Sequence, residues 1–420
     1  MREEIRAVLR REAGEEALIW AHNLALGRNM ILSDELAAHS ARTGTRLVSH
    51  HHDFWCDHRW ARWPEMRAQG FRTLARTASA AFAAQGRVLH AGINSSDVRL
   101  LSRHMDCTVW LPNPAGGVAR PGRPALARAK RWLQQELGDD APVWIYPARF
   151  LRRKNFAEAI LLARWLAPDA WLVTTGGVSS PGESAYARQL QGAARKARWR
   201  VRFGILARCG ARSPAVPELL CAAESIVMTS IQEGFGFPYL EAAGLGCRLI
   251  ARKLPAIQPD LEAFGIRLPG LYDEVLIPPG LFDAAAEIRR QRSLFLNWKT
   301  LLPGRCRSLA GTPDFLTGPA VPFSRLTLAA QLEVLAVPPR ESLDACAAWN
   351  PKIETLPRVS RTEWSGAPLL SPQACANRFL HHIAAFPQQR PSALQTENTQ
   401  QIIIQERLGQ NFLFPLLMQP

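Results

Sequence analysis

The sequence has little lysine, no closely spaced cysteines and no long apolar run. Only 6 of its 51 basic residues are lysine, and the arginines are spread along the chain, which is typical of a coding bias rather than of a polyanion-binding stripe. No apolar run approaches the about 20 residues needed to cross a bilayer, so no transmembrane helix is predicted. The N-terminal stretch MREEIRAVLRREAGEE is charged and helical in pattern, and it lacks the apolar centre of a signal peptide.

The eight cysteines include no Cys-x-x-Cys pair, which argues against a zinc knuckle and a disulfide framework. A reducing, cytoplasmic location is therefore expected. The net charge of +15 leaves peripheral attachment to the inner face of a membrane open. Nucleic acid is not the expected partner, because tryptophans that could stack on bases lie in patterns typical of a core. The cysteines are Cys56, Cys107, Cys209, Cys221, Cys247, Cys306, Cys346 and Cys375.

Alternating strand and helix patterns predict an α/β fold with parallel sheets in two domains. A first series of short apolar strands precedes a Gly-, Pro- and Arg-rich connection at residues 114–124. A second series, from residue 143, has the pattern of a doubly wound domain. The expected strands are 17–21, 46–49, 87–91 and 107–111 in the first series, and 143–148, 170–175, 201–205, 225–230 and 248–252 in the second.

The rest of the chain is less regular. A last strand at 274–277 and a helix at 282–297 are expected, and then the sequence becomes rich in Pro, Gln, Ser and Asn. One helix is expected near 371–385, and the apolar end FLFPLL is expected to dock on a domain. The predicted domains are 1–125, 126–310 and an irregular tail at 311–420 with one or two helices, which we expect to be dispensable for ligand binding.

The most informative stretch is EGFGFPYLE, which follows the apolar strand SIVMTS and opens a helix. Pro238 suits the first turn of that helix, while Gly234 and Gly236 let the backbone bend close to a ligand. Glu233 in the loop and Glu241 in the first helical turn could both accept hydrogen bonds from sugar or ribose hydroxyls. The alternative is a structural turn in which Glu241 only favours the helix dipole.

A basic loop follows the first strand of the second series, in the sequence YPARFLRRKN. Its residues would lie at the carboxyl edge of the same sheet, where open α/β sheets bind ligands. Arg149 offers a bidentate fork and Lys154 a compact charge, so both could hold a diphosphate. Asn155 could cap the next helix. For Arg152 and Arg153 we favour a solvated loop in an Arg-rich protein.

Together, PARFLRRKN, LVTTGG and EGFGFPYLEAAGLG resemble the donor domain of the family-four retaining glycosyltransferases. The paired-glutamate motif of that family matches Glu233 and Glu241 without a gap. The resemblance covers about residues 15–300, is strongest in 143–255 and does not extend beyond about 310. It implies a GT-B fold, in which two Rossmann-like lobes face a cleft and a nucleotide-sugar binds mainly to the C-terminal lobe.

The resemblance also implies a metal-independent, retaining hexosyl transfer without a cofactor. Glu241 would hold the ribose of the nucleotide and Glu233 the hydroxyls of the transferred sugar. Positive side chains and the helix N-terminus would stabilise the departing diphosphate. The implied catalytic residues are His52, Glu233, Arg149 and Lys154, and the implied donor-binding residues are Gly234, Phe235, Gly236 and Glu241.

Histidines follow the second predicted strand in the segment LVSHHHDF. By the resemblance we favour His52 as the histidine near the donor sugar. A metal site is the weaker alternative, because consecutive residues of an extended segment point alternately to opposite faces and rarely converge on one ion. His22, which follows the first strand, could line the cleft, or it could be a buried histidine satisfied by the backbone.

One departure from the family concerns the beginning of the first lobe. The strand and Gly-rich loop that normally open it are missing, and the chain enters at what resembles the fourth strand, so an incomplete N-terminal lobe is expected. The expected acceptor is a glycan, a lipid or a small molecule. The alternative function is a catalytically inactive nucleotide-sugar-binding or partner subunit.

Overall fold

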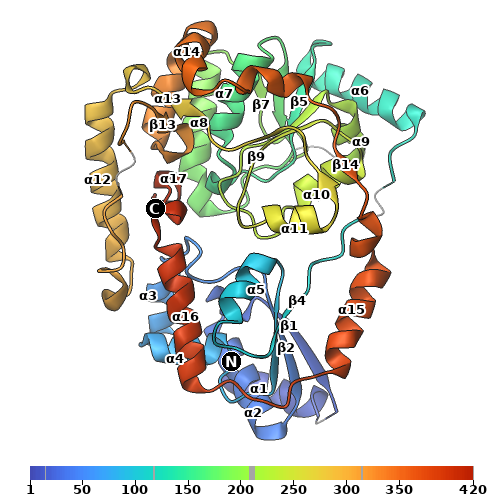
Figure 1. The fold of residues 1–420 in the computed structure, drawn as a ribbon, viewed down its shortest axis with the longest axis vertical. Helices are drawn as coiled ribbons and strands as arrows, with labels where there is room; N and C mark the ends of the chain where they lie inside the picture. The colour runs from blue at the N-terminus through green and yellow to red at the C-terminus, as the bar shows by residue number, and fades with distance from the viewer. Residues whose placement is uncertain (15, 117–118, 208–212, 314–315, 420) are drawn as a thin grey trace. The chain divides into compact units, whose positions relative to one another are not determined.

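The computed structural model describes residues 1–14, 16–116, 119–207, 213–313 and 316–419 (Figure 1). The chain forms two compact units, and each is assembled from segments far apart in the sequence. Part of the predicted connection and Cys209 lie outside the described residues, and the described cysteines are free thiols. Unit 1 comprises Met1–Pro114, Leu296–Pro313 and Leu369–Leu413, and unit 2 comprises Ala115–Phe295, Asp314–Pro368 and Phe414–Pro420.

Unit 1 contains a four-stranded parallel sheet in the order β1-β2-β3-β4. All four strands were predicted within two residues of their ends, because each is a short apolar run bounded by polar or turn residues. The strands are β1 Leu18–His22, β2 Arg46–His51, β3 Val88–Gly92 and β4 Thr108–Trp110.

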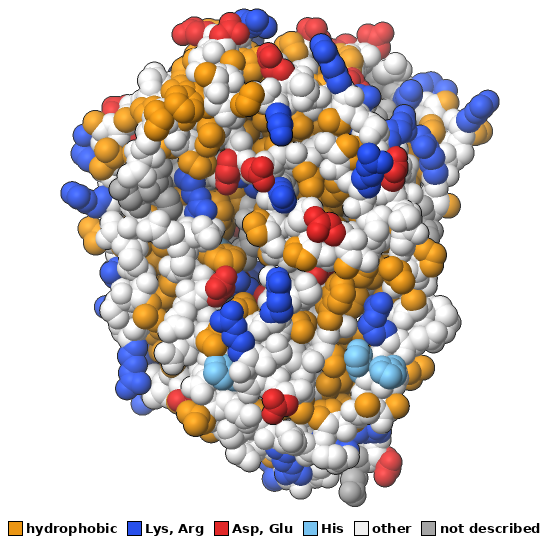
Figure 2. Space-filling model, in the orientation of Figure 1, with side chains coloured by type: hydrophobic (Ala, Val, Ile, Leu, Met, Phe, Trp, Pro, Cys, Tyr) orange, Lys and Arg blue, Asp and Glu red, His pale blue; other side chains and the backbone are white. Residues whose placement is uncertain are grey.

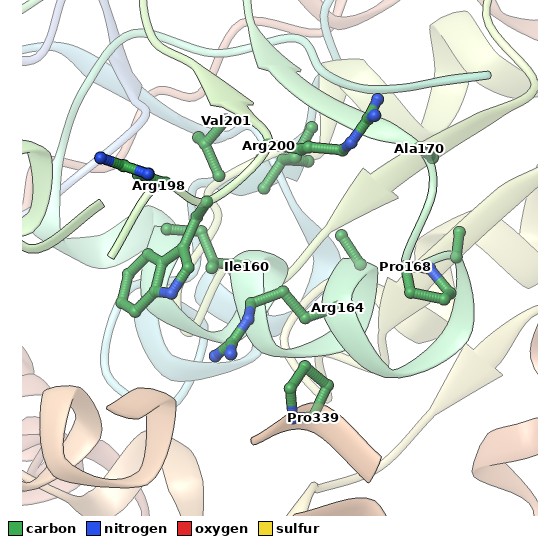
Figure 3. A pocket seen from close by; sticks show the side chains of 12 residues that line it. Ile160, Arg164, Pro168, Ala170, Arg198, Arg200, Val201 and Pro339 are labelled. Atoms are coloured by element: carbon green, nitrogen blue, oxygen red, sulfur yellow. The ribbon is translucent and has the colours of Figure 1, made fainter. Parts of the chain in front are cut away.

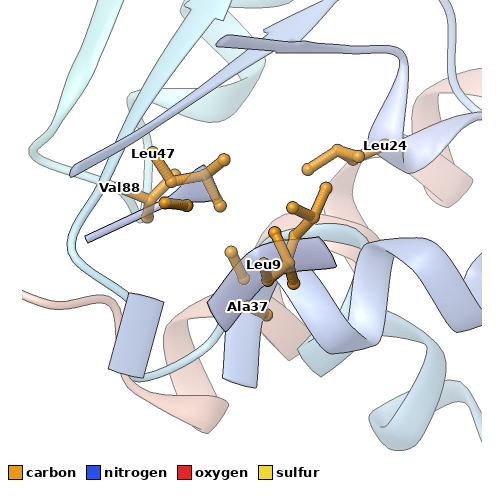
Figure 4. Packing of buried hydrophobic residues seen from close by; sticks show 8 residues of the cluster. Leu9, Leu24, Ala37, Leu47 and Val88 are labelled. Atoms are coloured by element: carbon orange, nitrogen blue, oxygen red, sulfur yellow. The ribbon is translucent and has the colours of Figure 1, made fainter. Parts of the chain in front are cut away.

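Helices α1 (Arg2–Glu12) and α2 (Met30–Thr43) contribute to the core on one face of this sheet. Leu9 of α1 and Ala37 of α2 pack with Leu47 of β2 in a buried cluster (Figure 4). The next residue of β2 points to the other face, as the two-residue period of a strand requires. The charged N-terminal helix predicted from the sequence is thus part of the unit 1 core.

The other face of the sheet is covered by the C-terminal segment. Val48 of β2 packs with Phe386, and Phe379 and Ile383 of α15 (Pro372–Ala384) join the same cluster. The helix predicted near 371–385 is therefore confirmed. A further helix, α16 (Ala393–Arg407), lies beside α4 (Leu74–Ala81) and α5 (Ser95–Leu101) (Figure 1) and was not predicted.

Unit 2 contains a six-stranded parallel sheet in the order β11-β9-β8-β5-β6-β7. Counted along the chain, this is the 3-2-1-4-5-6 order of the Rossmann fold, so the strand order reverses between β5 and β8. The predicted doubly wound domain is confirmed. The strands are β5 Val143–Tyr146, β6 Trp171–Thr174, β7 Val201–Arg202, β8 Ser225–Met228, β9 Leu249–Arg252 and β11 Leu271–Tyr272.

Two short strand pairings were missed or misplaced. The strand predicted at 274–277 is β12 (Leu276–Ile277), which pairs antiparallel with β13 (Val321–Pro322) outside the large sheet. In addition, β10 (Ile266–Arg267) pairs antiparallel with β14 (Glu363–Trp364). Two-residue strands carry no detectable period, so only the tertiary contacts specify them.

The segment after residue 310 is not an irregular tail with one or two helices. Five α-helices lie in its described part, and they pack into both units. Helix α13 (Leu328–Ala336) packs on α7 (Phe156–Leu166), while α15 and α16 belong to unit 1. The apolar end is packed as predicted: its residues from Phe414 onward belong to unit 2, where Leu416 is fully buried. Because this segment fills both cores, we no longer expect that residues 340–420 can be deleted without loss of ligand binding.

The remaining helices complete the two units. No described helix is both long and apolar enough to span a membrane. On the face shown in Figure 2, Lys and Arg side chains are scattered among acidic and apolar ones. The other helices are α3 Arg62–Ala68, α4 Leu74–Ala81, α5 Ser95–Leu101, α6 Arg123–Leu137, α7 Phe156–Leu166, α8 Ser184–Lys196, α9 Val216–Ala222, α10 Phe237–Gly244, α11 Gln258–Ala263, α12 Ala284–Thr300, α13 Leu328–Ala336, α14 Pro339–Cys346 and α17 Pro415–Met418.

Candidate functional site

The candidate site lies where two loops leave neighbouring strands of unit 2. Strands β5 and β8 pair in parallel, with Trp144 opposite Ser225, so their carboxyl ends meet at one edge of the sheet. One loop, residues 147–155, follows β5, and the other, residues 229–236, follows β8. The reversal of strand order between these two strands makes this edge the expected ligand crevice of an open α/β sheet.

Backbone carbonyls of the first loop are fixed by hydroxyl and amide groups of the sheet and the second loop. The Tyr146 hydroxyl donates to the Lys154 carbonyl at 2.7 Å, and the Thr229 hydroxyl donates to the same carbonyl at 3.0 Å. The Ile231 amide donates to the Arg153 carbonyl at 2.8 Å. These bonds hold the basic loop in one position relative to the second loop.

The Glu233 carboxylate is buried between two cations. Lys154 Nζ donates to its Oε1, and Arg153 Nη1 donates to its Oε2 at 3.0 Å. Burial acts to raise the pKa of Glu233, but the attraction of Lys154 and Arg153 outweighs it and holds that pKa below its usual value. Burial in turn lowers the pKa of the Lys154 ammonium, against the attraction of Glu233. Glu233 is therefore an ionised carboxylate at neutral pH.

The interpretation of Arg152 and Arg153 as solvated residues is wrong. Neither side chain is exposed, and Arg153 neutralises Glu233. The Arg152 guanidinium pairs with Glu183, whose carboxylate also accepts from the Arg152 amide at 2.9 Å. In an Arg-rich sequence nothing local distinguishes these two arginines from the others, because their acidic partners lie on other segments.

Arg149 differs from its neighbours in the loop because it is exposed. No described residue forms a hydrogen bond or ion pair with its guanidinium, which leaves the five donors of that group available to a ligand. Behind it, the LVTTGG segment approaches so closely that a Cβ at Gly176 would lie 2.8 Å from the Arg149 Cα. The glycine therefore sets the path of the loop that presents Arg149.

The turn into α10 needs its second glycine. Gly236 is the N-cap residue, with a left-handed φ of 80°, and a Cβ there would lie 2.7 Å from Ile257 Cδ1. Pro238 is in the first turn, as predicted. Gly234 is half-buried, whereas the Phe235 side chain is buried and packs edge-on against Phe237. The helix thus begins at the loop that carries Glu233.

Glu241 lies one residue beyond the first turn of α10, not within it, because the helix begins at Phe237. It is half-buried, and no described residue forms a hydrogen bond or ion pair with its carboxylate. Burial raises its pKa above the usual value. The stabilising interaction of an acidic residue with the helix dipole fades after the first turn. The alternative interpretation, in which Glu241 only favours the helix dipole, is therefore not supported by its position.

Supporting the site is a buried cluster that the sequence analysis missed. Arg252, at the end of β9, pairs with Glu158 of α7 at 2.5 Å and with Glu274. The Glu158 carboxylate also accepts from Asn155 Nδ2 at 2.8 Å and from the Tyr272 hydroxyl at 2.6 Å. Asn155 thus anchors the end of the basic loop. The available signal was an isolated Glu within the apolar run NFAEAILL.

His52 lies in unit 1, directly after β2. Its Nε2 lies 3.1 Å from Nδ1 of His22, and the His50 ring lies beside both. His22 is exposed, so the interpretation of a buried histidine is wrong, and no described backbone group forms a hydrogen bond with its ring. His51 points to the opposite face, where its Nε2 lies 3.0 Å from Nδ1 of His90. The alternation predicted for consecutive histidines is therefore present.

A cavity in unit 2 is separate from the candidate site. It is lined by residues that precede β6 and β7, together with Ile160 and Arg164 of α7 and Pro339 (Figure 3). This is the amino-terminal edge of the sheet, opposite the loops after β5 and β8. Arg164 is already engaged there by the carbonyls of Leu335 and Val337. The cavity therefore has no part in the candidate site.

Residues 130–266 match the family model described as glycosyl transferases group 1. The matched range contains both loops and the helix α10. This part of unit 2 is therefore similar to group 1 glycosyltransferases. The predicted α/β fold with parallel sheets is confirmed.

Among curated proteins, the chain is similar to mannosylglucosyl-3-phosphoglycerate synthase of Petrotoga mobilis. The two are 24% identical over 291 residues, which cover 66% of this chain and 54% of the relative. The chain thus spans about half the length of this relative.

Solved structures with similar chains include HepE of Anabaena in complex with UDP-glucose. That likeness has a TM-score of 0.47 and 16% identity, and it covers 85% of this chain and 81% of the other. An α,α-trehalose-phosphate synthase (UDP-forming) from Burkholderia vietnamiensis has a TM-score of 0.47 and 13% identity, with 91% and 75% of the two chains covered.

Proposed function

We propose that this protein transfers a hexose from a nucleotide-sugar donor to an acceptor hydroxyl and retains the anomeric configuration. The observation that carries the proposal is the loop pair after β5 and β8. It lies within the range that matches the group 1 family model, at the reversal of strand order, and it presents the exposed Arg149 beside the buried Lys154 and Glu233. Such an edge suits a ligand with a diphosphate and several hydroxyls.

The diphosphate of the donor would be held by positive groups of the two loops. Arg149 can form two parallel hydrogen bonds to phosphate oxygens, and Lys154 adds a second positive charge from within the same loop. The N-terminus of α10, reached through Gly234, Phe235 and Gly236, adds the partial positive charge of its backbone amides. These groups would stabilise the charge that develops on the leaving diphosphate without a metal ion.

The two glutamates would hold the sugar ends of the donor. Glu233 is kept ionised by its cations and has lone pairs left for hydroxyls of the transferred hexose. Glu241 has no described partner, so its carboxylate can accept hydrogen bonds from both ribose hydroxyls. Occupation by hydroxyl donors would also offset the cost of its partial burial. By the resemblance, His52 is the histidine that would contact the donor sugar.

Retention follows if the acceptor hydroxyl attacks from the face that the diphosphate leaves. The anomeric bond to the diphosphate breaks first, and a short-lived oxocarbenium-like sugar accepts the oxygen of the acceptor. The departing phosphate oxygen can take the proton of that hydroxyl. The first acceptors to test are sugars linked to phosphoglycerate, because the name of the Petrotoga relative describes a product of that class.

The test separates the two glutamates. UDP-, GDP- and ADP-sugars are titrated into the protein, and product formation with the acceptor panel is followed by mass spectrometry. Glu241→Ala should weaken nucleotide binding about 10-fold or more, whereas Glu233→Ala should mainly reduce transfer. The matched control is Glu136→Ala on the exposed surface of α6.

Two outcomes would count against the proposal. Donor binding without transfer to any acceptor would favour the nucleotide-sugar-binding partner subunit. If both site variants behave like the control, neither glutamate has the assigned role.

A further inference from the structure

Three histidines gather at the carboxyl ends of two neighbouring strands of unit 1. His22 is the last residue of β1, His50 lies in β2, and His52 follows β2 directly. One ring nitrogen from each lies within 4.8 Å of the others, and His22 Nδ1 is 3.1 Å from His52 Nε2. We propose that these three side chains bind a divalent transition metal of the zinc class, with a fourth position left for water or an anion.

Strand register explains why the three side chains meet. The parallel pairing of β1 and β2 places His22 opposite His50. Residues 50 and 52 are two apart, so both point to the same face of the sheet, while His51 points to the other. Consecutive histidines do not converge, as expected, but alternate ones converge with a histidine of the adjacent strand.

The hydrogen bond of His50 leaves one of its ring nitrogens for a ligand. Its Nε2 lies 2.8 Å from the Leu111 carbonyl, which can only accept, so Nε2 carries the proton. Its Nδ1 then holds the lone pair, and this buried atom has no hydrogen-bond partner among the described residues. Metal-binding histidines commonly donate their second ring N–H to a carbonyl in this way, which fixes the tautomer and the ring orientation.

Aromatic side chains pack against the histidine cluster. Trp20 stacks on His22 and His50 and is itself stacked on Phe379 of α15. The aromatic wall holds the rings in place.

The spacing fits a small ion. Zn–N bonds of about 2.0–2.1 Å in a tetrahedron put neighbouring ligand nitrogens roughly 3.3 Å apart. The 3.1 Å between His22 and His52 nitrogens is close to that edge, and the remaining separations need small ring rotations. Three histidines with an open fourth position are also the ligand set of catalytic zinc sites, in which the ion binds water or an anionic group.

The metal proposal goes beyond the proposed function, which uses no metal and assigns His52 to the donor sugar instead, and it can be tested without a donor. The protein is prepared without an affinity tag, and a chelator removes any bound metal. It is then titrated with cobalt(II), and the cobalt-loaded protein is titrated with zinc. We expect one cobalt per chain, visible ligand-field bands of a tetrahedral site, and displacement of cobalt by zinc. Zinc should also raise the Tm of the wild-type protein.

The site variant is His22→Ala/His52→Ala, and the matched control is His381→Ala/His382→Ala, which removes two histidines from α15. The site variant should lose more than about 100-fold in metal affinity, whereas the control should bind like wild type. Circular dichroism checks that both are folded. Absence of tetrahedral cobalt bands in the wild type would overturn the proposal whatever the variants do. Equal affinities in the two variants would overturn it as well.

Discussion

The two parallel sheets present different chemistry at their carboxyl edges. In unit 2, the loops after β5 and β8 carry formal charges, and the buried ones are compensated: Glu233 lies between Lys154 and Arg153. In unit 1, the ends of β1 and β2 carry the imidazoles of His22, His50 and His52. An exposed arginine beside a compensated carboxylate suits an anion, whereas imidazole lone pairs suit a cation. The two proposals therefore assign ligands of opposite charge to the same edge of the two sheets.

A second difference concerns what holds each unit together. Each has a buried arginine between two carboxylates. In unit 2, Arg252 joins Glu158 and Glu274, all within the stretch that also forms the large sheet. In unit 1, Arg407 of α16 reaches back to Asp57 at 2.5 Å and Asp97 at 2.6 Å. The C-terminal segment is therefore an integral part of unit 1.

The largest expected effect is on the stability of unit 1. Arg407→Met leaves the buried carboxylates of Asp57 and Asp97 without their cation, so we expect a loss of about 3–5 kcal/mol in the free energy of unfolding. Chemical denaturation followed by tryptophan fluorescence measures it. The control, Arg340→Met, breaks an exposed ion pair and should cost less than about 1 kcal/mol.

A rescue variant sharpens this test. Combining Arg407→Met with Asp57→Asn and Asp97→Asn removes the uncompensated charges and should recover part of the lost stability. A single Arg407→Met variant as stable as the control would show that α16 is not held by this cluster.

The next effect concerns the backbone of the unit 2 site. Gly236→Ala forces a side chain into a left-handed conformation and against Ile257, and we expect it to cost about 1–3 kcal/mol. Gly192→Ala in α8 has open space around the new methyl group and should stabilise the protein by about 0.5–1 kcal/mol. Thermal unfolding of both variants measures the contrast. Effects of the same sign would contradict the role given to the Gly236 turn.

The smallest expected effect concerns Glu241. Burial raises its pKa, so the folded state binds a proton more tightly than the unfolded state, and the ionised carboxylate costs stability at neutral pH. That cost disappears as the pH falls below the ordinary value of 4.5. Glu241→Gln should therefore raise the free energy of unfolding by about 0.5 kcal/mol at pH 7.5 and have no effect at pH 4.

Denaturation at the two pH values tests this prediction, with Glu136→Gln as the exposed control. A destabilised Glu241→Gln at pH 7.5 would show that the carboxylate has a stabilising partner. If Glu241→Gln raised the free energy of unfolding but weakened nucleotide binding, Glu241 would show the trade-off between stability and activity that is typical of functional residues.

The large sheets could be predicted because each long strand is an apolar run followed by a polar or glycine-rich loop. Strand β5 reads VWIY and β8 reads SIVM, and both were placed correctly at their first residue. The missed pairings, such as β10 with β14, contain two residues each and are specified only by contacts between distant segments. Helix α16 was missed because it buries polar residues such as Thr399 and Gln400, which give no apolar period.

The site was predictable only in part. The sequence placed Arg149, Lys154 and Glu233 at one sheet edge, since parallel strands share their carboxyl ends. It could not identify Arg153 as the second cation of Glu233, because that pairing depends on the fold of the loop. The sequence also could not show that His22 lies close to His50 and His52, because this proximity depends on the register between β1 and β2.

The most direct test of the central claim is calorimetric titration of the wild type, Arg149→Ala and Arg188→Ala with UDP-, GDP- and ADP-sugars. Arg188 is exposed on α8, so its variant makes the same change of charge outside the site. We predict that one class of donor binds the wild type and Arg188→Ala alike, and that Arg149→Ala binds it about 10- to 100-fold more weakly. Failure of the wild type to bind any donor, or equal affinities in the two variants, would contradict a donor site at the loops after β5 and β8.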